Sequence, residues 1–87
     1  MFGSKTTEVS GVHQATLERR YLRRIREIND KLRRLLDTHR NWDDADPRLR
    51  AHYTREEFWT QFIAYQYEER RSYIRKLRDV RRGIVRD

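Results

Sequence analysis

The sequence predicts an all-α protein in which two long antiparallel helices form a hairpin. Two observations lead to this fold class. Apolar residues recur at alternating spacings of four and three over residues 15–40 and again over 55–82, which is the period of a helix that packs along one stripe. The stretch 41–53 between them breaks this period and carries the one proline of the chain. A loop of that length between two long helices favours an antiparallel pair.

Residues 1–13 precede the first periodic segment. They mix glycine, serine, threonine and lysine without an apolar period, a composition that supplies no face for burial. We therefore expect a flexible N-terminal arm, followed by a helical hairpin that occupies residues 14–87.

The first helix is expected over about residues 15–40, where neither glycine nor proline interrupts the pattern. Two pairs of opposite charge at i,i+4, Glu27 with Lys31 and Asp30 with Arg34, support a helix in this segment. The stripe that faces the second helix is predicted to consist of Tyr21, Ile25, Ile28, Leu32 and Leu35.

The loop over 41–53 is expected to contain one short helical turn, because Asp46 and Pro47 suit an N-cap and the first helical residue. The second helix is expected over about 55–82. Thr54 and Glu57 have the spacing of a capping box, and a glycine at position 83 is expected to end the helix. The stripe of this helix is predicted to be Trp59, Ile63, Gln66, Arg70, Tyr73, Leu77, Val80 and Ile84.

Gln66 and Arg70 are polar residues on an otherwise apolar stripe. We consider two explanations for Arg70. It pairs with an acidic residue across the helix interface and fixes the register, or it marks a kink or the end of the facing helix. His39 is expected to pack at the edge of the stripe of the first helix.

The hairpin alone is expected to bury a small core. The chain has 87 residues, 36% of them apolar, and no cysteine, so neither a disulfide nor a thiolate metal site can stabilise it. Seven of the ten aromatic residues lie between Tyr53 and Tyr73, which is more than one facing helix can cover. We therefore expect oligomerisation, or docking into a larger complex, to complete the fold.

Positive charge falls in two blocks that a hairpin would bring to one end. The chain has 18 arginines, three lysines and a net charge of +7. Residues 16–40 carry a net charge of +5, residues 41–69 one of −4, and residues 70–87 one of +6. A domain that is this basic at one end is expected to attract polyanions or an acidic protein surface.

Eight arginines that lie off the predicted stripes are the candidate nucleic-acid-binding residues. Arginine binds phosphate with a planar fork of donors, and a surface of such groups would follow a nucleic-acid backbone without reading base sequence. The alternatives are an ordinary solvated helix surface and a surface for an acidic protein. The eight residues are Arg19, Arg20, Arg23, Arg26, Arg71, Arg75, Arg78 and Arg82.

The aromatic middle of the chain is the candidate protein interface. Base stacking is another use of such residues, but aromatic residues at helical spacing favour a core or an interface, and the nearby glutamates would repel phosphate. The candidate interface residues are Tyr53, Phe58, Trp59, Phe62, Ile63 and Tyr67.

The sequence contains no recognisable catalytic or metal-binding pattern. The three histidines have no ligand spacing, and the aspartates at 43–46 are not followed by the glycine and glutamate of a calcium loop. We therefore expect no enzyme activity, no metal and no cofactor. No apolar run reaches the roughly 18 residues of a membrane span, and no hydrophobic signal segment opens the chain. We expect a cytoplasmic or virion-internal protein that is not secreted and does not contact a membrane.

Together these features predict a non-catalytic binding or assembly subunit. Its arginine-rich end would contact a nucleic-acid backbone non-specifically, and its aromatic and acidic end would contact protein. The alternative is a structural scaffold or capsid-associated protein that binds no nucleic acid. Copies of such a protein would join through helix–helix contacts, with the basic end of one copy on the acidic end of the next.

Overall fold

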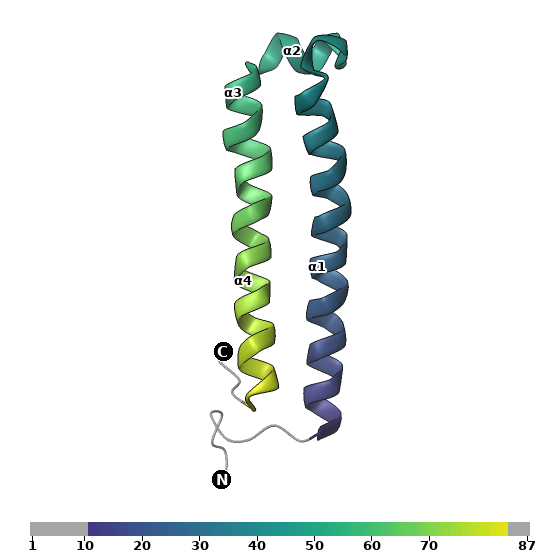
Figure 1. Ribbon diagram of the computed structural model, residues 1–87, viewed down its shortest axis with the longest axis vertical. Coiled ribbons are helices and arrows are strands. Elements are labelled where there is room, and N and C mark those ends of the chain that lie inside the picture. Colours follow the sequence, from purple (N-terminus) through teal and green to yellow (C-terminus); the bar gives the residue numbers. More distant parts are fainter. Residues whose placement is uncertain (1–10, 84–87) are drawn as a thin grey trace.

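The computed structural model describes the backbone of residues 11–83 and the side chains of residues 13–83. Within that range the chain is helical and contains no strand, and two long helical segments lie side by side in opposite directions (Figure 1). The rod measures 58 × 18 × 17 Å. The predicted all-α hairpin is therefore confirmed. Its elements are α1 (Gly11–Arg40), η1 (Trp42–Asp44), α2 (Pro47–His52), α3 (Arg55–Phe58), the π-turn η2 (Trp59–Ile63) and α4 (Ala64–Arg81).

Helix α1 begins at Gly11, about four residues before the predicted start, and ends at Arg40 as expected. Residues 11–13, assigned to the flexible arm, are therefore helical, and the rest of that arm lies outside the described residues. A tertiary contact accounts for the earlier start. The side-chain amide of Gln14 donates a hydrogen bond of 2.7 Å to the carbonyl of Val80 near the end of α4, and apolar periodicity does not reveal such a contact.

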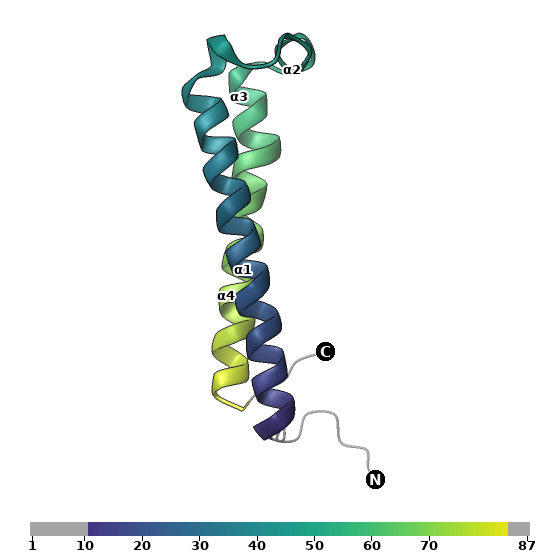
Figure 2. The ribbon, with the colours of Figure 1, turned by 90° about the vertical axis from the view of Figure 1, so that its right-hand side faces the viewer.

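The tip follows its predicted capping chemistry. The Asp46 carboxylate accepts a hydrogen bond of 2.9 Å from the backbone N–H of Arg48, and Pro47 is the first residue of α2. Helix α2 lies at the tip, and Figure 2 shows it end-on, to one side of the upper ends of the two long segments. Leu49 of α2 packs against the core, so the turn is held against the upper end of the hairpin.

The second long segment starts with the predicted capping box. The backbone N–H of Glu57 donates to the Thr54 hydroxyl at 3.0 Å, and the Glu57 carboxylate accepts from the backbone N–H of Thr54 at 2.8 Å. The segment ends as expected near Gly83, which has a φ of +78° and donates its N–H to the carbonyl of Val80. The final predicted stripe residue, Ile84, lies outside the described residues.

A π-turn interrupts this segment, and the sequence pattern did not predict it. Phe58 and Ile63 are both buried, although residues five apart in an α-helix point about 140° away from each other. The i→i+5 bonding of a π-turn places such residues nearly one above the other, so both reach the core. The prediction that Trp59 lies on the stripe is wrong for the same reason, because Phe58 takes the core position and Trp59 remains 40% exposed.

The core is concentrated in the upper half of the rod. Ile28 and Leu32 of α1 pack against Phe58 and Ile63 in one buried cluster. Aromatic side chains extend this cluster, with ring centroids 5.2 Å apart for Trp42 and Phe58 and again for Phe58 and Phe62. The lower half is held by three further buried side chains, Leu17, Leu77 and Val80.

Replacing Ile63 with alanine should destabilise the hairpin strongly. Its side chain is fully buried, and deleting buried aliphatic groups of this size costs about 2–5 kcal/mol. Ile63→Val removes one methyl group and should cost about 0.5–1.5 kcal/mol. Urea unfolding followed by circular dichroism measures both. Equal effects for the two variants would contradict this account of the core.

Replacing Gln66 with leucine should stabilise the hairpin. Gln66 is 5% exposed on the buried stripe, and its Oε1 has no hydrogen-bond partner among the described residues. An unpaired buried polar atom costs about 1–3 kcal/mol, which leucine would remove while filling similar space. The same unfolding measurement tests this, with the exposed Gln61→Leu as the matched control. A loss of stability in Gln66→Leu alone would show that Gln66 has a hidden partner.

Candidate functional site

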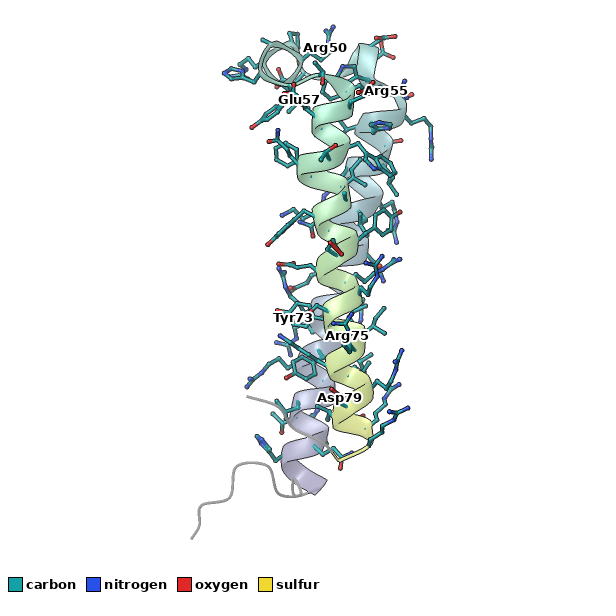
Figure 3. The ribbon with its side chains drawn as sticks, turned by 90° about the vertical axis from the view of Figure 1, so that its left-hand side faces the viewer. Arg50, Arg55, Glu57, Tyr73, Arg75 and Asp79 are labelled. Atoms are coloured by element: carbon teal, nitrogen blue, oxygen red, sulfur yellow. The ribbon has the colours of Figure 1, made fainter. Side chains whose placement is uncertain are left out.

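We call the interface between α1 and the second helical segment the seam. Contacts across it place the two basic blocks in the same half of the rod. The Arg24 guanidinium donates to the Glu69 carboxylate at 3.1 Å, and the Tyr21 and Tyr73 ring centroids lie 6.0 Å apart. Arg75 and Asp79 lie in the lower half of the rod, far from the tip (Figure 3). The start of α1 and the end of α4 therefore form one arginine-rich base, hereafter the base, opposite the tip formed by residues 41–58.

A hollow on α1 gathers three of the predicted arginines. It has a volume of about 350 Å³ and is lined by Thr16, Arg19, Arg20 and Arg23. All three guanidinium groups are exposed, and none forms an ion pair with a described residue. Arg19 donates its Nε to the carbonyl of Ala15 at 3.5 Å, which leaves its outer nitrogens free. We name this site the α1 hollow.

A second hollow lies on α4 and differs in chemistry. It measures about 310 Å³ and combines two apolar side chains, Ile74 and Leu77, with Arg78, Arg81 and Arg82. Leu77 is buried, whereas Ile74 is 42% exposed. This α4 hollow therefore has apolar walls and a cationic rim. Arg81 is absent from the predicted site, although its position three residues after Arg78 places both on one side of the helix.

A third hollow, in the upper half of α1, has nearly the same size and number of arginines. It measures about 360 Å³ and is lined by Arg33, Arg34, Asp37 and Arg40. Here carboxylates reduce the positive charge, because Arg40 lies 4.0 Å from Asp37 and Arg33 lies 3.6 Å from Asp30. Hollows of similar size on one helix thus differ in whether their arginines are neutralised.

The remaining predicted arginines fall into two groups. Arg26 and Arg75 are exposed on the base and form no ion pair within the described part of the chain. Arg71 instead pairs with Glu68 at 2.9 Å. The Glu68 carboxylate offsets the charge of Arg71, so Arg71 attracts a polyanion less strongly. The structure therefore gathers Arg19, Arg20 and Arg23 at one hollow and Arg78 and Arg82 at another.

Arg70 has an amide partner in place of the expected acid. Its guanidinium donates to Asn29 Oδ1 at 2.9 Å and lies 5.1 Å from the Tyr67 ring centroid. The prediction of an acidic partner is wrong. The alternative of a kink is wrong too, since α4 runs as an α-helix through this position. Arg70 still crosses the seam, because its Nη1 donates to Asn29 of α1, while its guanidinium lies over the Tyr67 ring of its own helix.

Arg24 organises the opposite flank of the seam. Hydrogen bonds to Glu27 and Tyr73, together with the charge of Glu69, raise the pKa of Arg24 above its ordinary value. Tyr65 donates its hydroxyl to the other oxygen of Glu69 at 2.9 Å. This bond and the carboxylate charge raise the pKa of Tyr65. The chain of contacts links α1 to α4 on the side away from Arg70.

The predicted protein interface is divided between core and surface. Phe58 and Ile63 are buried inside the hairpin, where they pack against α1 and are not available to a partner. Tyr53 and Phe62 are half-buried and meet edge to face at 5.1 Å. Trp59 is exposed, with its ring 5.1 Å from His39 and 6.5 Å from the half-buried Tyr67. His39 thus packs at the edge of the seam, as expected.

The tip carries carboxylates that neutralise no described cation. Asp43, Asp44 and Glu56 are exposed and form no ion pair with residues 13–83. Across the same residues no group of three histidine or acidic side chains gathers as a metal site. No helix of the described chain is long and apolar enough to span a membrane. Comparison with protein-family models, curated proteins and solved structures finds no match.

The raised pKa of Tyr65 predicts a specific loss of stability in alkali. The pKa is higher in the folded state than the unfolded value of about 10, so the hydrogen bond to Glu69 contributes below that pH. This contribution is lost as the pH rises through the folded-state pKa. Urea unfolding between pH 8 and 11 should show a larger decrease for the wild type than for Tyr65→Phe. Parallel curves for the two proteins would contradict the assignment.

Proposed function

We propose that this protein is a non-catalytic binding and assembly subunit whose base contacts a nucleic-acid backbone without reading sequence. The observation that carries the proposal is the α1 hollow, where three exposed arginines share one concave surface and no described carboxylate neutralises them. Planar guanidinium groups match phosphate oxygens in geometry as well as charge. A compartment that holds nucleic acid, the cytoplasm or the interior of a virion, fits this function.

The state of these arginines favours binding over a structural role. Arg20 and Arg23 have no ion pair to break within the described chain before they meet a phosphate. Each phosphate contact would release condensed counterions, which is the main source of non-specific affinity for nucleic acid. Arg26 and Arg75, also exposed, would widen the contact around the base.

The shape of the rod favours contact with the backbone over insertion into a groove. Its cross-section is 18 × 17 Å, whereas the major groove of DNA is about 12 Å wide. The two long helical segments lie side by side (Figure 1) and are in contact both near the tip and near the base, so neither is free to enter the groove alone. Contact through phosphates supplies affinity and position but no direct base recognition.

The tip is proposed to contact protein, which would complete the fold by oligomerisation or docking. Trp59, which directly follows the tip, supports this part, because it is exposed and tryptophan is enriched among the residues that dominate binding energy. The free carboxylates of Asp43, Asp44 and Glu56 support the alternative function, a scaffold in which the base of one copy meets the tip of the next. The two functions differ in whether nucleic acid binds at all.

A salt titration with fluorescent duplex DNA and single-stranded RNA tests the proposal. For duplex DNA, log K decreases with log salt, and each phosphate that the protein neutralises adds about 0.9 to the steepness of this line. The variant Arg19→Gln/Arg20→Gln/Arg23→Gln should therefore flatten the slope by about 2–3 and weaken binding at low salt. Circular dichroism checks that the variant remains helical.

The matched control is Arg33→Gln/Arg34→Gln/Arg40→Gln. It removes three positive charges from a hollow of similar size on the same helix, and it should change the slope much less. Equal slopes for the two variants would show that net charge alone drives binding. Absence of binding at low salt by the wild type would reject nucleic acid and favour the scaffold.

A further inference from the structure

One flank of the hairpin carries a strip of apolar side chains that the described residues leave partly exposed. On the second helical segment it includes Trp59, Tyr67 and Ile74, of which Trp59 is 40% and Ile74 is 42% exposed. On α1 the half-buried Leu22, Ile25 and Leu36 follow spacings of three and eleven, which keep them on one side of a helix. These six residues form what we call the apolar flank.

The two halves of the apolar flank lie on the same side of the rod. Asn29 is four residues after Ile25, and Arg70 is four residues before Ile74, so each lies beside the strip on its own helix. The hydrogen bond of 2.9 Å between Asn29 and Arg70 joins these two rows. Arg24, Glu69 and Tyr65 occupy the opposite flank.

The π-turn aligns Trp59 with the rest of the strip. In a regular α-helix, Trp59 and Tyr67, eight residues apart, would be rotated about 80° from each other. The π-turn over Trp59–Ile63 holds one residue more than a turn of α-helix, and this reduces the rotation between Trp59 and Tyr67. Their ring centroids consequently lie 6.5 Å apart on one side of the helix.

We propose that a second copy of this chain covers the apolar flank in an antiparallel, two-fold dimer, and that the Trp59 of each copy enters the α4 hollow of the other. This deepens the protein contact proposed for the tip and rests on that part of the proposed function, not on nucleic-acid binding. The α4 hollow suits an indole ring, since Ile74 and Leu77 supply apolar walls and three arginines supply a cationic rim.

The positions of these groups fit a single register. A two-fold axis beside Tyr67 places Trp59 of one copy opposite residues 74–76 of the other. The centre of the segment Arg55–Arg81 falls at Glu68, so this axis lets the two rods overlap along their whole length. A flank of 58 × 17 Å is large enough for the roughly 800 Å² that each partner buries in a standard interface.

The charges agree with the same antiparallel register. Glu56 lies three residues before Trp59, on the same side of the helix, and the axis places it opposite Arg78 of the second copy. The free carboxylates of Asp43 and Asp44 then approach the partner's base. The α1 hollow stays outside, because Arg20 and Arg23 project from the side of α1 away from Ile25. In a parallel pair, the arginine-rich bases of the two copies would instead lie next to each other.

Sedimentation equilibrium and light scattering of the full chain test the dimer. The expected mass is twice the 10.9 kDa of one chain, at moderate salt and without nucleic acid. Ile74→Gln should raise the dissociation constant by about tenfold or more, as expected when a central interface residue is replaced. Tyr65→Gln is the matched control, because Tyr65 is 54% exposed on the opposite flank, and it should change the constant less than about twofold.

A charge exchange tests the register. Glu56→Arg and Arg78→Glu are both surface substitutions, and each alone should weaken the dimer by setting like charges opposite each other. The double variant Glu56→Arg/Arg78→Glu should restore the dissociation constant to within about threefold of the wild type. Failure of the double variant to recover would overturn this register.

Other outcomes reject the dimer as a whole. A mass of one chain at all concentrations, or equal effects of Ile74→Gln and Tyr65→Gln, would do so. A mass that grows steadily with concentration would indicate open head-to-tail contacts instead of a closed pair. The Arg19→Gln/Arg20→Gln/Arg23→Gln variant should remain dimeric while its salt dependence changes, so failure of nucleic-acid binding and failure of dimerisation can be told apart.

Discussion

The packed seam between α1 and the second helical segment fixes the axial register of the two helices. The distribution of charge along the rod follows from this register. Ile28 and Leu32 meet Phe58 and Ile63 near the tip, and Gln14 reaches Val80 near the base. A slip of one turn would move each helix by about 5.4 Å and break these contacts together. With the register fixed, the first part of α1 and the last part of α4 must share one end, so a single bend converts two separate basic blocks into one base.

The arginines of this base are distinguished by what surrounds them. Surface ion pairs contribute about 0–1 kcal/mol, so pairing Arg40 with Asp37 does little for stability. It changes the local potential, however, because a carboxylate among three arginines offsets the attraction for an anion. The α1 hollow lacks such a group among the described residues, and its like charges repel by about 1 kcal/mol or less per pair in water. The fold tolerates this repulsion, and a bound polyanion would remove it.

The sequence revealed the parts of this structure that depend on local chemistry. Asp46, Thr54 and Glu57 cap helices as their spacing predicts, because capping involves atoms within a few residues of each other. The earlier start of α1 and the Asn29 partner of Arg70 depend on contacts between distant residues, which period and composition do not encode. Phe58 and Trp59 are adjacent, aromatic and equally compatible with the pattern, so which of them enters the core is decided by the tertiary fold.

That choice between Phe58 and Trp59 links the core to the surface. The core requires Phe58 and Ile63 together, and the π-turn that satisfies this requirement also turns Trp59 outward. A regular helix could bury Phe58 or Ile63 against α1, but not both with the same neighbours. A backbone irregularity would normally weaken a helix, yet here the packing of two large side chains offsets it. The exposed tryptophan is therefore a consequence of how the core near the tip packs, and any partner that covers it would bind a residue whose outward position follows from that packing.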